Sequence, residues 1–130
     1  MKRVLIIIGI AILCIIAGGY LTLHIWIGDS VKDHIQLAQQ KYSGSAEDAL
    51  ISFLLDESSS PKERTHKAIW TLGQIRSEKA LPLLKDLYKD DPEGKTCYGR
   101  HDAELCQYEI HKAIRAIERR SLIAYARLNK

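Results

Sequence analysis

The chain opens with a long apolar run and continues as shorter amphipathic segments. From Val4 to Ile27, 24 consecutive residues include no Asp, Glu, Lys or Arg. At about 1.5 Å per residue, a helix of this length spans roughly 36 Å, more than the hydrocarbon core of about 30 Å. The pattern therefore predicts an N-terminal transmembrane helix.

The same run could also open a secretory signal peptide, because Lys2-Arg3 precedes it. A cleaved signal has an apolar region of about 7–15 residues followed by small residues. Ala17-Gly18-Gly19 is a poor match to such a site, and the apolar run continues to Ile27. A lipoprotein modified at Cys14 is disfavoured by the large Leu13 beside the cut. We favour an uncleaved signal anchor, and cleavage stays open.

The basic flank predicts the orientation. Lys2 and Arg3 are the only charges on the short side of the run, and basic residues stay cytoplasmic. The C-terminal part is then expected in the periplasm or cell exterior. We divide the chain into a stub and anchor (1–28), a juxtamembrane capping helix (29–44) and a repeat domain (45–130).

Beyond the anchor, helical periodicity recurs behind clear start signals. Ser30, Ser45, Ser60 and Ser77 each precede an amphipathic segment, as N-cap residues do, and Pro61 suits a first helical position. No segment has the sustained alternation of a half-buried strand. The fold class predicted is all-α. The expected elements are helices over 30–42 and from Ser45, Ser60, Ser77 and about Asp102, with a loop at Lys89–Arg100.

Two helix pairs repeat within the predicted domain. His66-Lys67-Ala68-Ile69 recurs as His111-Lys112-Ala113-Ile114, each time in the second helix of a pair. In the first helices, 49–54 corresponds to 80–85. Repetition of a helix pair is typical of a solenoid.

The repeated residues resemble the HEAT repeat, including the short bacterial variety of bilin-lyase-like proteins. Ala80-Leu81-Pro82-Leu83-Leu84-Lys85-Asp86-Leu87 is similar to the first helix of that family, and Ala68-Ile69-Trp70-Thr71-Leu72-Gly73-Gln74-Ile75 to the second. The resemblance runs from about Ser45 to Arg120. It departs from the family pattern at Glu118 and Arg120, where Gly and Ile are expected. The resemblance implies a protein-binding scaffold and does not name the ligand.

Charge adds little to this picture. The formal net charge is +3, of which Lys2 and Arg3 supply two, so the rest of the chain is nearly neutral. This gives no electrostatic reason to expect a nucleic-acid partner. The basic residues near the C-terminus are interpreted as a solvated helix face: Arg115, Arg119, Arg120, Arg127 and Lys130.

Two cysteines outside the apolar run predict a disulfide. Outside the cytoplasm, Cys97 and Cys106 favour pairing with each other. Zinc is an alternative, because His101 and His111 would complete a set of two sulfur and two nitrogen ligands. The spacing disfavours zinc, since Cys106 and His111 stand about 140° apart around a helix. We therefore assign the disulfide, no metal and no cofactor.

Candidate chemistry is confined to binding. No nucleophile elbow, zinc-protease motif or phosphate loop is present, so no catalytic residue is assigned and an enzyme is not expected. Trp70 and Arg115 each follow a His-Lys-Ala-Ile repeat and form the candidate binding surface. Alternatively, Trp70 packs against the helix over 30–42.

The function predicted is a membrane-anchored adaptor or accessory subunit that binds another protein of the cell envelope. Two alternatives stay open: an immunity-type binder that inhibits a toxin, and, less favoured, a lyase-like enzyme or small-ligand chaperone.

Overall fold

The computed structural model describes the backbone of residues 2–128 and the side chains of residues 6–119. All regular structure in this described part is helical, so the predicted all-α fold class is confirmed. The chain forms two compact units, Met1–Lys32 and Asp33–Lys130.

Helix α1 extends over Lys2–Lys41, and its first part is the predicted apolar helix. Every side chain from Ile6 to Trp26 is exposed, and the segment reaches a mean hydropathy of 2.5. By length and composition, this is the one helix of the described chain that could cross a membrane. It is compatible with a single-pass anchor.

The expected helix start at Ser30 is wrong. Helix α1 continues through Ser30 without a break and ends at Lys41. A capping serine is needed only where the first backbone N–H groups of a helix lack partners. Because the preceding residues are already helical, the N–H groups around Ser30 bond to carbonyls four residues earlier.

The other three serine caps are confirmed. In each case the serine hydroxyl oxygen accepts a backbone N–H three residues later, which satisfies a donor that the helix leaves free. The pairs are Ser45 with Asp48 (3.2 Å), Ser60 with Glu63 (3.2 Å) and Ser77 with Ala80 (3.3 Å). Pro61 occupies the first position of its helix, as expected.

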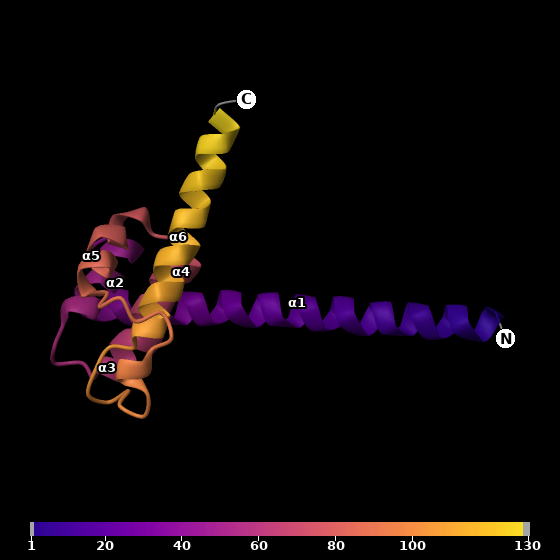
Figure 1. The fold of residues 1–130 in the computed structure, drawn as a ribbon, viewed down its shortest axis with the longest axis horizontal. Helices are drawn as coiled ribbons and strands as arrows, with labels where there is room; N and C mark the ends of the chain where they lie inside the picture. The colour runs from indigo at the N-terminus through magenta and orange to yellow at the C-terminus, as the bar shows by residue number, and fades with distance from the viewer. Residues whose placement is uncertain (1, 129–130) are drawn as a thin grey trace. The chain divides into compact units, whose positions relative to one another are not determined.

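The second unit begins with the last turns of α1 and then packs its helices around one core. Helix α6 lies along α4 and α5, and α2 lies against the π-helix η1 (Figure 1). The remaining elements are α2 (Ala46–Leu55), α3 (Pro61–Glu63), η1 (Arg64–Ile69), α4 (Trp70–Gln74), the 3₁₀-helix η2 (Glu78–Ala80), α5 (Leu81–Leu87), the 3₁₀-helix η3 (Lys95–Cys97) and α6 (Gln107–Leu128).

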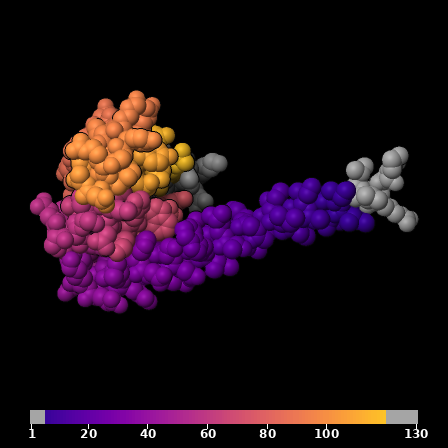
Figure 2. Space-filling model, turned by 90° about the horizontal axis from the view of Figure 1, so that it is seen from below, coloured from indigo at the N-terminus to yellow at the C-terminus, as the bar shows by residue number. Residues whose placement is uncertain are grey.

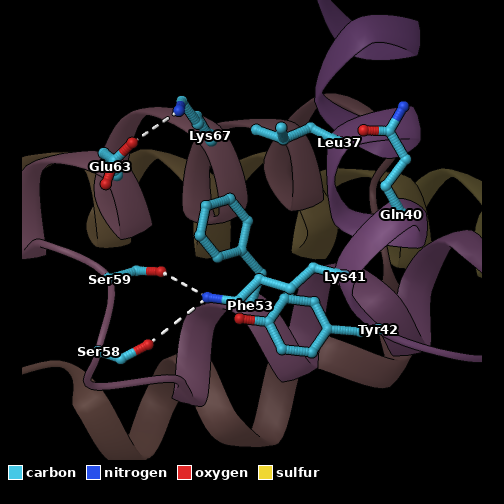
Figure 3. A pocket seen from close by; sticks show the side chains of 9 residues that line it. All are labelled: Leu37, Gln40, Lys41, Tyr42, Phe53, Ser58, Ser59, Glu63 and Lys67. Carbon is cyan, nitrogen blue, oxygen red and sulfur yellow. Dashed lines mark hydrogen bonds and ion pairs between the residues drawn. The ribbon is translucent and has the colours of Figure 1, made fainter.

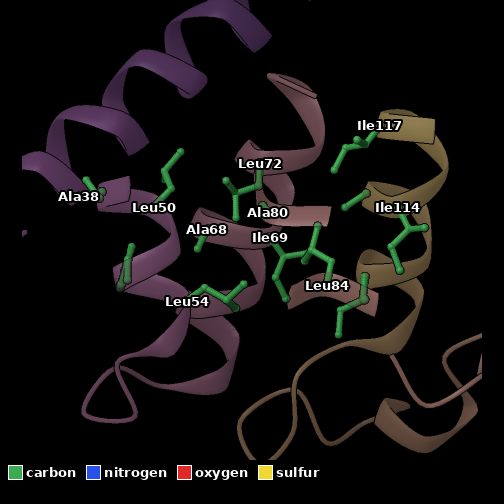
Figure 4. Close-up of a cluster of buried hydrophobic side chains, with 14 residues drawn as sticks. Ala38, Leu50, Leu54, Ala68, Ile69, Leu72, Ala80, Leu84, Ile114 and Ile117 are labelled. Atoms are coloured by element: carbon green, nitrogen blue, oxygen red, sulfur yellow. The ribbon is translucent and has the colours of Figure 1, made fainter. Parts of the chain in front are cut away.

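The core joins both helix pairs. Ile69 and Leu72 lie between the side chains of α2 and those of α6 (Figure 4). Leu50 and Leu54 reach this core from α2, and Ile117 reaches it from α6; all five are fully buried. The inner faces predicted from helical spacing therefore form a single core rather than two separate ones.

Helices α4 and α6 approach each other closely at Gly73. A Cβ atom at Gly73 would lie 3.0 Å from both the Cα and the Cβ of Ala113. A side chain there would push the two helices apart. Gly73 therefore allows the second helices of the two repeats to approach this closely.

The second helix of the first pair contains a π-helical segment that the sequence did not predict. The N–H of Trp70 bonds to the carbonyl of Thr65, five residues earlier, instead of four. Such a shift rotates the residues before it relative to those after it, and π segments are frequent at functional sites.

The last helix starts later than expected. It begins at Gln107, not at about Asp102, and the chain between α5 and α6 is irregular apart from η3. Cys106 stands at the junction: its carbonyl accepts the N–H of Ile110, and its own N–H donates to the Thr65 hydroxyl (3.2 Å). That tertiary bond fixes the helix start at a place where the local sequence gives no cap.

Candidate functional site

Trp70 and Arg115 line two neighbouring hollows of one surface. Trp70 lines a small hollow of about 80 Å³ between α4 and α6. Arg115 lines a shallower hollow of about 400 Å³ along α6. The hollows share Lys112 and Ala116, so the two predicted residues are neighbours on one surface but do not line the same hollow. We refer to Trp70, Lys112, Arg115 and Ala116 as the α4–α6 surface.

Trp70 is half-buried and also contacts the end of α1. The His34 ring meets it edge-on, with the ring centroids 5.6 Å apart. His34 Nδ1 in turn lies 2.9 Å from the Thr71 hydroxyl oxygen. Burial, followed by the positive charge of Lys67, lowers the pKa of His34. Trp70 therefore packs against the end of α1, as the alternative prediction stated. Part of its indole ring stays accessible to solvent.

The α6 side of this surface is basic. Arg115 and Arg119 are exposed and line the same hollow as Lys112. The Lys112 ammonium lies 4.6 Å from the Tyr108 ring centroid and 2.7 Å from a Glu109 carboxylate oxygen. The side chains of the other members of the predicted basic cluster lie outside the described residues: Arg120, Arg127 and Lys130.

A larger groove, of about 480 Å³, lies where the end of α1 meets α2 and α3. The sequence did not reveal it, because its walls come from separate segments. Figure 3 shows Phe53 and Tyr42 in the middle of the lining side chains, with Leu37 and Lys67 together on one side of them. The lining residues are Leu37, Gln40, Lys41, Tyr42, Phe53, Ser58, Ser59, Glu63 and Lys67.

Asp56 holds the end of α1 to the turn after α2 beside this groove. Its carboxylate accepts hydrogen bonds from the Lys41 ammonium (2.6 Å), the Tyr42 hydroxyl and the backbone N–H of Ser58 (2.9 Å). These bonds, that of Lys41 above all, hold the pKa of Asp56 well below its usual range. The charged groups at this end of the groove are therefore engaged with one another.

The Asp56 network predicts a pH-dependent effect on stability. A carboxyl whose pKa is lowered by folding stabilises the fold above its unfolded pKa of about 3.9, and this contribution is lost as the pH falls towards the folded pKa. Asp56→Asn should therefore be clearly less stable than the wild type near pH 7. The gap should narrow below about pH 4, because the wild type then loses the same contribution. Urea midpoints measured across this range check the prediction.

Asp86→Asn, at an exposed position on α5, is the matched control and should change the midpoint little at any pH. A gap between wild type and Asp56→Asn that stays constant with pH would contradict the assignment of the effect to this carboxylate.

Cys97 and Cys106 meet in the loop between α5 and α6. Both are buried free thiols, with their Sγ atoms 3.0 Å apart. Burial, followed by the hydrogen bond with Cys97, raises the pKa of the Cys106 thiol. The disulfide between them stays a prediction.

The four residues weighed as a zinc set do not all converge. A ring nitrogen of His101 lies within 4.8 Å of both sulfurs. His111 is elsewhere, with its ring against Tyr88 at 5.6 Å between centroids. His66, expected at the helix surface, is exposed there and lies near His101.

Comparison with known proteins supports the repeat assignment. Residues 35–96, just under half of the chain, match the family model of HEAT repeats. This supports a HEAT-repeat family, a class of helical repeats that mediate protein–protein interaction. The match includes the last turns of α1 and stops before α6. No curated protein and no solved structure matches the chain significantly.

Proposed function

We propose that the protein is a membrane-anchored adaptor or accessory subunit that binds another protein of the cell envelope through its α4–α6 surface. The first part of α1 spans the bilayer uncleaved, with Lys2 and Arg3 on the cytoplasmic side and the repeat domain outside the cytoplasm. The partner offers an acidic segment to this surface.

The anchor rests on the composition of α1. From Val4 to Ile27 it contains no Asp, Glu, Lys or Arg, and none of the side chains in its apolar window is buried. A soluble protein would cover so long an apolar surface, since contiguous apolar patches on monomers rarely exceed a few hundred Å². Tyr20 and Trp26 suit the interfacial belt of a membrane helix.

The binding surface rests on one observation: the hollows of Trp70 and Arg115 share Lys112 and Ala116. The half-exposed Trp70 and the exposed Arg115 belong to residue types that are enriched among the interface residues that dominate binding energy. Arg115 and Arg119 give the surface a positive charge that attracts a carboxylate-rich partner segment. The repeat fold supports the same class of function.

Trp70→Ala combined with Arg115→Glu is expected to abolish capture of the partner. The first change removes the apolar anchor, and the second reverses a charge that faces the partner. A contact at a binding hot spot is worth about 2 kcal/mol or more, so each of the two changes should weaken binding by about thirtyfold or further. Full-length protein is captured from detergent-solubilised membranes, and mass spectrometry compares the proteins retained by wild type and variant.

The control makes the same kinds of change elsewhere. Leu55→Ala with Lys62→Glu removes an exposed apolar side chain and reverses an exposed charge, and should leave capture intact. Circular dichroism verifies that both variants are folded. If the Trp70/Arg115 variant is folded and retains the same proteins as wild type, this surface is not the binding site.

A further inference from the structure

Three metal-ligating side chains converge in the loop between α5 and α6. The Sγ atoms of Cys97 and Cys106 and a ring nitrogen of His101 all lie within 4.8 Å of one another. Both thiols are buried and His101 is exposed, so the cluster has an inner side and a side open to solvent. A fourth donor is close: the His66 ring centroid lies 6.5 Å from that of His101.

The backbone around the two sulfurs is fixed by contacts from several segments. The Cys97 thiol donates to the carbonyl of Gly94 (3.2 Å), which has φ +67° and lies against Tyr108. The N–H of Cys106 donates to the hydroxyl of Thr65, the neighbour of His66 in η1. Figure 2 shows the orange atoms of this loop directly on the magenta atoms of residues 61–75. The π-helix and the cysteine loop are thus tied together at the cluster.

We propose that Cys97, Cys106, His101 and His66 bind a zinc ion when the two cysteines are reduced. Two thiolates and two imidazoles form a set that tetrahedral zinc accepts, with Zn–S of about 2.3 Å and Zn–N of about 2.0–2.1 Å. Two sulfurs on one such ion lie about 3.8 Å apart. The two Sγ atoms are now 3.0 Å apart, so binding of zinc requires them to separate by less than 1 Å more. His66 turns its exposed side chain inward, and both thiols release their protons to solvent.

Zinc and the expected disulfide compete for the same two sulfur atoms. A disulfide accounts for the pairing of Cys97 with Cys106, but it has no need of an imidazole beside both sulfurs. A cross-link stabilises a long irregular loop in a small domain, and zinc would supply one through residues of both the loop and η1. This inference is independent of the proposed adaptor function.

The test uses full-length protein in detergent, with Cys14→Ser as the background so that no third thiol binds metal. Reduced protein is titrated with Zn²⁺ against a chromogenic chelator, and Co²⁺ replaces Zn²⁺ for spectroscopy. We expect binding of one ion per chain and a thiolate-to-cobalt charge-transfer band. Loss of an outer-shell partner of a metal site costs about 10–100-fold in affinity. Removal of a direct ligand in His101→Ala or His66→Ala should cost at least as much.

His111→Ala is the matched control, because the His111 ring lies against Tyr88 and not in the cluster. It should bind zinc as the background does. Absence of stoichiometric binding by the reduced background overturns the site, and so does unchanged affinity in His101→Ala. Unchanged affinity in His66→Ala overturns the assignment of the fourth ligand.

Alkylation of the protein as isolated provides a second measurement. Thiols of Cys97 and Cys106 that react only after a chelator is added support the metal site. Thiols that react only after a reductant is added identify the disulfide and overturn zinc as the resident state. Thiols that react without either treatment also overturn it.

Discussion

Leu72→Ala is expected to destabilise the repeat domain by about 2–5 kcal/mol, the range found when a fully buried leucine is truncated. Leu72 is inaccessible to solvent and lies between the side chains of α2 and α6. Its removal leaves a cavity at the place where the two helix pairs share their core. The free energy of unfolding of a domain of this size is about 5–15 kcal/mol, so the expected loss is a large share of it. Urea unfolding of the full-length protein in detergent, followed by circular dichroism, measures it.

Leu55→Ala provides the matched control, since it makes the same chemical change at a leucine that is 53% exposed. Its free energy of unfolding should differ from the wild type by no more than about 0.5 kcal/mol. Equal losses in the two variants would mean that the helix pairs do not share one core around Leu72. A broader urea transition in Leu72→Ala, which begins at the same urea concentration as that of the wild type, would indicate that the two repeats unfold separately.

The helix starts that could be predicted are those that local chemistry decides. Ser45, Ser60 and Ser77 each follow a break in the helical pattern. The serine hydroxyl therefore accepts a hydrogen bond from a backbone N–H that has no carbonyl partner within the helix. Ser30 carries the same motif but follows residues that are already helical, and no free N–H is left for it. The motif therefore predicts a helix start only when the preceding chain is not helical.

Features that depend on tertiary contacts could not be predicted from the spacing of residues. The start of α6 is fixed by the bond from Cys106 to Thr65, 41 positions earlier in the chain. The π-helical hydrogen bond of Trp70 leaves no mark in the hydrophobic pattern. The groove beside Asp56 combines residues of successive elements, from the end of α1 to η1, that face one another only after the chain folds back on itself. In each case the partner residues become neighbours only in the folded chain.

The cysteine cluster shows where spacing rules stop being useful. Cys106 and His111 have different surroundings, since the His111 ring lies against Tyr88. Cys97, His101 and Cys106 all lie before α6, in an irregular part of the chain where helical angles do not apply. His66 entered no spacing argument, because it belongs to the other repeat. A ligand set built from a loop and a distant helix is visible only once the two are packed together.

Charged residues in the apolar part of α1 are expected to release the protein from the membrane. Ile12→Lys with Ile16→Lys places two ammonium groups near the centre of the Val4–Ile27 run. Each lysine at such a position costs about 2.5–3.5 kcal/mol of insertion free energy. The two together exceed 5 kcal/mol, which lowers the inserted fraction by more than about a thousandfold. Extraction of membranes with alkaline carbonate, followed by immunoblotting, measures the fraction that stays in the pellet.

The wild type should remain in the pellet, as should Ile12→Leu with Ile16→Leu, which changes the same positions without adding charge. Retention of the lysine variant in the pellet would contradict the insertion of α1 as the membrane anchor. The intact mass of the pelleted wild type addresses the anchor itself. A chain shortened near Ala17-Gly18-Gly19 would contradict an uncleaved anchor, because cleavage removes most of the apolar run and leaves too few residues to cross the hydrocarbon core.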